Sequence, residues 1–103
     1  MTTAADERTE DDFLQIVSAI CVADTSLNPL GAALLAANYL GIAKDTRTFA
    51  RKLGVEHALV LREITALDQH GGFLTIAGRN ARTQRLEFVL TGKGTRLAAL
   101  ACD

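Results

Sequence analysis

The segment from residue 45 to residue 90 carries the pattern that most constrains the fold. Apolar residues recur at helical spacing on both sides of Gly54-Val55, a dipeptide typical of a tight turn. The pair Gly71-Gly72 ends the second helical stretch, and beyond it apolar and polar residues alternate as they do in β-strands. The sequence therefore predicts an α+β domain, mostly α-helical, in which two helices joined by a tight turn precede a short sheet.

Ordinary start and stop signals bound the expected helices. A first helix over residues 12–23 is apolar over a wide arc, which is typical of a helix with partners on two sides. Asn28 and Pro29 suit the N-cap and first turn of a second helix, which we expect to end at Gly41. The third helix follows a cap at Asp45 or Thr46 and ends at Gly54, the fourth covers residues 56–70, and a last short helix, capped by Thr91, covers residues 92–101.

The apolar positions also predict which side of each later element is buried. In the fourth helix the buried face carries Val60, Ile64 and Leu67. A polar hairpin tip over residues 78–85 separates two strands, the first beginning with Phe73, Leu74 and Ile76 and the second containing Leu86, Phe88 and Leu90. This order of elements is that of a winged helix-turn-helix, in which the two-stranded β-hairpin forms the wing.

Length and charge define the domain organisation. The chain has 103 residues, of which 49% are hydrophobic, enough for one core and too few for two domains. Residues 1–12 carry five acids and one Arg, a sum of −4, whereas residues 44–96 carry ten Lys or Arg and five acids, a sum of +5. We therefore expect a disordered acidic tail over residues 1–11 and a single basic domain over residues 12–103.

The same composition indicates the compartment and the absence of a prosthetic group. The acidic N-terminus lacks the layout of a secretory signal, and the longest uncharged run, residues 25–43, contains Pro and Asn and predicts a loop and a core helix rather than a membrane span. Cys21 and Cys102 are too few for a disulfide scaffold and match no zinc spacing with the two histidines. The expectation is a cytoplasmic protein with no cofactor and no metal. No pattern of catalytic residues predicts an enzyme.

Three short stretches resemble a known family. These are residues 49–55 (FARKLGV), residues 67–71 (LDQHG) and residues 90–94 (LTGKG), the last after an arginine-bearing wing. Together they make residues 27–99 similar to the DNA-binding core of the multiple-antibiotic-resistance-regulator (MarR) family of bacterial transcription factors. The resemblance implies a dimeric regulator that binds double-stranded DNA sequence-specifically and dimerises through its first and last helices.

Physical reasoning about such a fold assigns the contacts to DNA. The helix over residues 56–70 would enter the major groove, where Arg62 could read a guanine edge and Ala58 or Leu61 a thymine methyl group. Cations on the third helix and on the wing, residues 79–85, would bind phosphates or the minor groove. The predicted DNA-binding residues are Arg47, Arg51, Lys52, His57, Ala58, Leu61, Arg62, Arg79, Arg82 and Arg85. Two alternatives stay open, that the wing arginines only solubilise the tip and that His57 is an ordinary surface residue.

The apolar first helix and the fourth helix each raise a further expectation. The first helix is predicted to form a homodimer through Phe13, Ile16, Val17 and Ile20, since two-fold DNA sites require two-fold proteins. The fourth helix offers Leu59 and Leu61 where hydrogen bonds to base edges are expected. The alternative function is therefore a winged-helix interaction module or adaptor that binds a protein partner in the transcription machinery without strong DNA binding.

Overall fold

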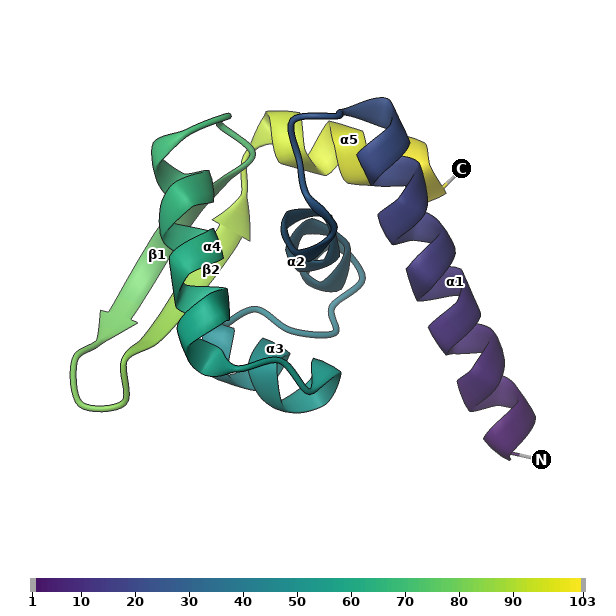
Figure 1. Cartoon of the computed structure of the whole chain (residues 1–103), viewed down its shortest axis with the longest axis horizontal. Helices are drawn as coiled ribbons and strands as arrows, with labels where there is room; N and C mark the ends of the chain where they lie inside the picture. The colour runs from purple at the N-terminus through teal and green to yellow at the C-terminus, as the bar shows by residue number, and fades with distance from the viewer. Residues whose placement is uncertain (1, 103) are drawn as a thin grey trace.

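A computed structural model of the chain describes residues 2–102, and their side chains from Asp12 onward. The chain is α+β and mostly helical, with five helices and one two-stranded antiparallel hairpin (Figure 1). In chain order the elements are α1 (Thr2–Ala23), α2 (Pro29–Tyr39), α3 (Thr46–Leu53), α4 (His57–Gln69), β1 (Leu74–Asn80), β2 (Arg85–Leu90) and α5 (Gly92–Cys102). This layout confirms the predicted class and is compatible with a winged helix.

The helix starts follow the predicted caps. The side chain of Asn28 accepts a hydrogen bond from the backbone N–H of Gly31 at 2.8 Å, and that of Asp45 accepts one from Thr48 N–H at 2.8 Å. Each bond satisfies an amide that has no partner within the helix itself. The choice between Asp45 and Thr46 as cap of α3 is thus settled in favour of Asp45, which leaves the Thr46 hydroxyl for other contacts.

The turn between α3 and α4 is tight because of one residue. Gly54 has φ +67°, a left-handed conformation that glycine adopts without steric cost. Val55 then donates its N–H to the carbonyl of Ala50 at 3.1 Å and packs against the core. Beyond the turn, α4 buries Val60, Ile64 and Leu67, as the apolar spacing predicts.

The hairpin is longer than predicted. Its strands pair from Leu74–Leu90 to Asn80–Arg85, with an irregularity between Ile76 and Gly78, so the tip is shorter than the expected loop over residues 78–85. The carboxylate of Asp68, near the end of α4, accepts the N–H of Ile76 at 3.1 Å beside this irregularity. Cross-strand pairing thus extends the strands through residues whose composition alone is typical of a loop.

Helix α2 forms the centre of the molecule. Its residues from Gly31 to Ala37 are all buried except the partly exposed Ala33, as expected of a helix that is apolar on every side. Helices α1 and α5 lie together on one side of it, whereas α4 and the hairpin lie on the other (Figure 1). The fold therefore has two flanks on either side of the central helix, and α5 of one flank also contacts β2 of the other.

Helix α1 spans a longer stretch than the predicted helix over residues 12–23. The structure begins it at Thr2, where the sequence predicted a disordered tail over residues 1–11, and the side chains of those residues lie outside the described part. Ile20 is fully buried against the core.

None of the helices within residues 2–102 is both long and apolar enough to cross a membrane.

Helix α5 is fixed to the hairpin by a close backbone approach. A Cβ atom on Gly94 would lie 2.0 Å from the carbonyl oxygen of Phe73, so only glycine fits there. Thr91 caps the helix by accepting the N–H of Gly94 at 3.2 Å, and its own N–H donates to the same carbonyl of Phe73 at 3.0 Å. The sequence Thr91-Gly92-Lys93-Gly94 thus joins β2 and α5 in one compact turn.

Candidate nucleic-acid interface

Helix α3, the start of α4 and the hairpin tip lie at the same end of the molecule (Figure 1). Arg47 of α3 holds the tip directly, because its Nε and Nη2 atoms both donate to the carbonyl oxygen of Thr83, at 3.0 and 2.8 Å. Arg47, which the sequence predicts to bind a DNA phosphate, is thus already hydrogen-bonded within the chain. A guanidinium has further N–H donors, so these bonds leave room for an external anion.

A second contact ties β2 to the same helix. Arg85 Nε lies 3.5 Å from a carboxylate oxygen of Asp45, the residue that caps α3. Burial raises the pKa of Asp45, but hydrogen bonds from the backbone and hydroxyl of Thr48 and the charge of Arg85 together hold it below its usual value. Asp45 is therefore ionised and partly neutralises Arg85. We call the contacts of Arg47 with Thr83 and of Arg85 with Asp45 the hairpin clasp.

His57 lies at the first position of α4 and is half-buried rather than exposed. Its Nε2 atom lies 2.8 Å from Oγ1 of Thr46, and the same Oγ1 accepts the backbone N–H of Leu86 at 3.1 Å. The side chain of Thr46 is completely buried. Sequence reasoning missed this residue, and the only signal was its place beside Asp45 as a second candidate cap.

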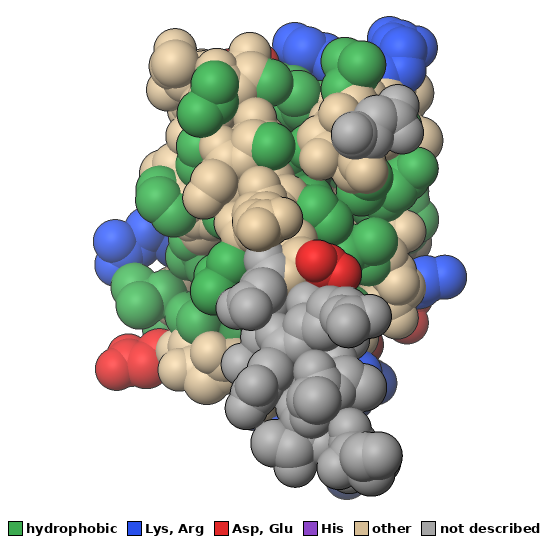
Figure 2. Space-filling view, turned by 90° about the vertical axis from the view of Figure 1, so that its right-hand side faces the viewer, with side chains coloured by type: hydrophobic (Ala, Val, Ile, Leu, Met, Phe, Trp, Pro, Cys, Tyr) green, Lys and Arg blue, Asp and Glu red, His purple; other side chains and the backbone are tan. Residues whose placement is uncertain are grey.

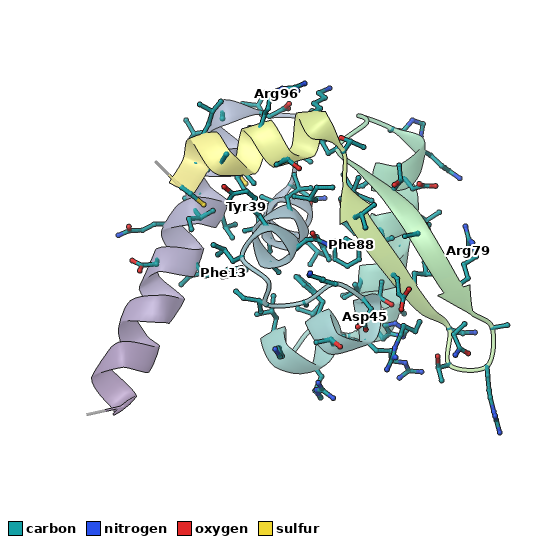
Figure 3. All side chains as sticks on the ribbon, turned by 180° about the vertical axis from the view of Figure 1, so that it is seen from behind. Phe13, Tyr39, Asp45, Arg79, Phe88 and Arg96 are labelled. Atoms are coloured by element: carbon teal, nitrogen blue, oxygen red, sulfur yellow. The ribbon has the colours of Figure 1, made fainter. Side chains whose placement is uncertain are left out.

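Four of the predicted cations are exposed and have no internal partner. Within residues 12–102, the guanidinium groups of Arg51, Arg62, Arg79 and Arg82 make no hydrogen bond or ion pair. Figure 3 shows Arg79 on the outer side of the hairpin, away from the helices. Lys52 is also exposed, but its ammonium donates to the carbonyl of Ile42 at 2.9 Å. These side chains place positive charge on α3, on α4 and along the hairpin.

The solvent face of α4 matches the prediction only in part. Ala58, Arg62 and Thr65 are exposed as expected, whereas Leu61 is half-buried and packs against the core. Leu59 takes the exposed position instead, with 41% of its surface accessible. The hydroxyl of Thr65 donates to the carbonyl of Leu61 at 2.8 Å. Arg62 is therefore the strongest hydrogen-bond donor that the middle of this face presents.

The residues predicted for dimerisation face the core of their own chain. Phe13, Ile16 and Val17 are half-buried against it, and Ile20 has no exposed surface in the single chain. Their role in dimerisation stays a prediction. The wide apolar arc of α1 reflects packing on α2 and α5 together. A shallow cavity of about 790 Å³ nevertheless opens beside Phe13 and Ile16, between α1, the residues after α2 and the end of α5.

The most exposed apolar residues of α1 and α5 are not the ones predicted for dimerisation. Leu14 is 61% exposed, Val22 80% and Leu100 71%. Figure 2 shows hydrophobic side chains spread over the face that α1 and α5 form. We call Leu14, Val22 and Leu100 the apolar flank.

Cys21 is partly buried on the same helix as Leu14 and Val22, and no group of three or more potential metal ligands occurs in the described part of the chain.

Comparison of the chain with protein-family models, with curated proteins and with solved structures finds no match.

Proposed function

We propose that the chain is a winged helix-turn-helix regulator of transcription that binds double-stranded DNA sequence-specifically and resembles the MarR family. The observation that carries the proposal is a set of exposed arginines on α3, α4 and the hairpin that have no partner among residues 12–102. They are Arg51, Arg62, Arg79 and Arg82. Unpaired cations spread over two helices and a hairpin complement the regularly spaced phosphates of a duplex. A regulator of this kind acts in the cytoplasm of a bacterium.

Recognition would be divided between two elements. Helix α4 enters the major groove, which is about 12 Å wide, with Arg62 donating to a guanine edge and Ala58 in contact with a thymine methyl group. The hairpin acts as the wing, on which Arg79 and Arg82 bind the backbone or the minor groove. Arg51 and Lys52 bind phosphates on the other side of α4. Arg47 and Arg85 mainly hold the wing in place through the hairpin clasp.

A titration against random duplex DNA at two salt concentrations tests the proposal. Binding should weaken steeply with salt because each phosphate contact releases a counterion. Changing Arg79 and Arg82 to Ala should lower affinity at least about tenfold and reduce the salt slope by about 2. Arg96→Ala is the matched control, because Arg96 is an exposed cation on α5, away from the hairpin (Figure 3). Absence of binding at low salt, or equal losses in both variants, would refute the proposal.

We further propose that the regulator is a homodimer, because two half-sites of a two-fold operator require two copies of α4. The apolar flank of Leu14, Val22 and Leu100 offers the contact surface. Leu14→Glu combined with Leu100→Glu should yield folded monomers, measured as mass in solution. Thr25→Glu, at an exposed position after α1, is the control that adds charge without removing apolar surface. An unchanged mass in the double variant would contradict this interface.

One observation favours a second candidate function. Ala58, Leu59 and Ala66 make the solvent face of α4 apolar for a helix that reads base edges. The alternative is an interaction module or adaptor whose α4 binds a partner protein of the transcription machinery. Leu59→Lys separates the two functions, since an added cation on this face should strengthen DNA binding and weaken binding to an apolar protein surface.

A further inference from the structure

The Thr46 hydroxyl joins three elements at one buried point. Thr46 begins α3, accepts the N–H of Leu86 from β2 at 3.1 Å, and lies 2.8 Å from the Nε2 atom of His57 at the start of α4. It is the one polar side chain that is fully buried among residues 12–102. Its hydrogen bonds are therefore shielded from water, and they connect the helix proposed to read bases with the strand that leads from the wing.

One direction of these bonds gives the Thr46 proton an acceptor, and it corresponds to one tautomer of His57. The backbone N–H of Leu86 can only donate, so Thr46 Oγ1 accepts there. The hydroxyl has one proton of its own, and His57 Nε2 is the acceptor that the described structure offers it. Nε2 can accept only in a neutral imidazole whose proton sits on Nδ1. Burial and the charge of Arg47 lower the pKa of His57, while Asp45 opposes them, so the surroundings favour the same neutral form.

We infer that neutral His57 is a positioning residue, which through the Thr46 hydroxyl sets the start of α4 against β2 and so fixes the angle between the recognition helix and the wing. The effect on DNA rests on the proposed function, whereas the hydrogen-bond arrangement does not. His57 would thus act without touching DNA, in contrast to the contact predicted from the sequence.

Protonation of His57 should loosen this junction. An imidazolium donates from Nε2, so Thr46 Oγ1 would accept twice and its own proton would lose its partner in a buried place. The added charge also faces Arg47 of α3. Asp45 of α3 attracts it but is already engaged with Arg85 of β2, and Glu56 is its neighbour at the start of α4. Acid should therefore weaken DNA binding, whereas a histidine that touches a phosphate would bind more tightly in acid.

The first experiment needs no DNA and reads the imidazole nitrogens by NMR. The wild-type protein should show the Nδ1–H tautomer, and Thr46→Val should raise the pKa of His57 and speed hydrogen exchange at the Leu86 amide. Thr46→Ser keeps the hydroxyl and should restore both properties. A neutral His57 protonated on Nε2, or a titration that Thr46→Val leaves unchanged, would overturn the inference even if the protein binds DNA. Failure to bind DNA would overturn only the proposed function.

The second experiment measures DNA affinity at fixed salt between about pH 5 and about pH 7.5, a range that extends well below the ordinary pKa of histidine because that of His57 is lowered. Wild-type affinity should fall several-fold toward the acid end. His57→Gln retains a carbonyl that can accept from Thr46 and has no titratable proton, so it should bind normally at the upper pH and lose the pH dependence. Affinity that rises in acid in the wild-type protein, but not in His57→Gln, would show a direct contact instead.

Discussion

The two flanks of the molecule are held and exposed in opposite ways. The flank of α3, α4 and the hairpin carries side-chain hydrogen bonds between elements. Arg47 donates to Thr83, Thr46 accepts from Leu86 and hydrogen-bonds to His57, and Asp68 accepts from Ile76. In the other flank, α1 and α5 contact each other through apolar side chains. The exposed side chains of this flank include Leu14, Val22 and Leu100. Directional bonds specify angles between elements more strictly than apolar packing, which tolerates changes of shape that keep the packed volume.

This contrast fits the two tasks proposed above, DNA binding and association with a second copy. A surface that must match the geometry of a duplex needs its helix and hairpin at a set angle, which directional hydrogen bonds provide. A surface that associates with a second copy needs apolar area, which the other flank exposes. The predictions below separate the contributions of the flanks, from the largest expected effect to the smallest.

Ile20→Ala should lower the free energy of unfolding by about 4 kcal/mol, because it empties a fully buried site where α1 packs on the core. Leu14→Ala, six residues earlier on the same helix but 61% exposed, should change it by less than about 0.5 kcal/mol. Urea denaturation of both variants measures the difference. If both variants lost the same free energy of unfolding, the exposed face of α1 would stabilise the fold as much as its buried face does.

Gly94→Ala should cost about 3 kcal/mol, because the added Cβ would lie 2.0 Å from the carbonyl oxygen of Phe73 where α5 meets the hairpin. Gly92→Ala is the control, since a Cβ there meets only the end of the flexible Arg96 side chain, at 3.4 Å. The two variants differ by position alone, and thermal unfolding compares them. A stable Gly94→Ala protein would show that α5 can move away from the hairpin without loss.

Arg47→Ala should destabilise the fold by about 1 kcal/mol, since it removes the two hydrogen bonds that the clasp makes to Thr83. The change should be concentrated at the hairpin tip, where amide hydrogen exchange would accelerate while the amides of α1 stay unaffected. Arg51→Ala, which removes an exposed arginine of the same helix, should leave both exchange and stability unchanged. Uniform acceleration in Arg47→Ala would mean that the tip is not held separately.

The success of the sequence predictions also differs between kinds of interaction. The sequence predicts the cap at Asn28, the turn at Gly54 and a cap at Asp45 or Thr46, because these features depend on residues next to one another in the chain. It does not predict the buried state of Ile20, because a wide apolar arc does not say which part of it faces the core of the same chain. The partners of Arg47 and His57 lie 36 and 11 residues away, and no local pattern encodes such pairs.

The smallest expected effect concerns the ion pair of the clasp. Asp45→Asn keeps an N-cap of similar strength and removes the charge that faces Arg85, so it should cost about 0.5 kcal/mol near neutral pH. Because the folded protein lowers the pKa of Asp45 below its ordinary value of 3.8, the carboxylate stabilises the fold above that value, and its contribution is lost as the pH falls through the lower folded value. The wild-type protein should therefore lose its small advantage over Asp45→Asn on acidification below about pH 4. Urea denaturation at several pH values measures this, and an advantage that persisted in strong acid would mean that the ion pair with Arg85 is not its source.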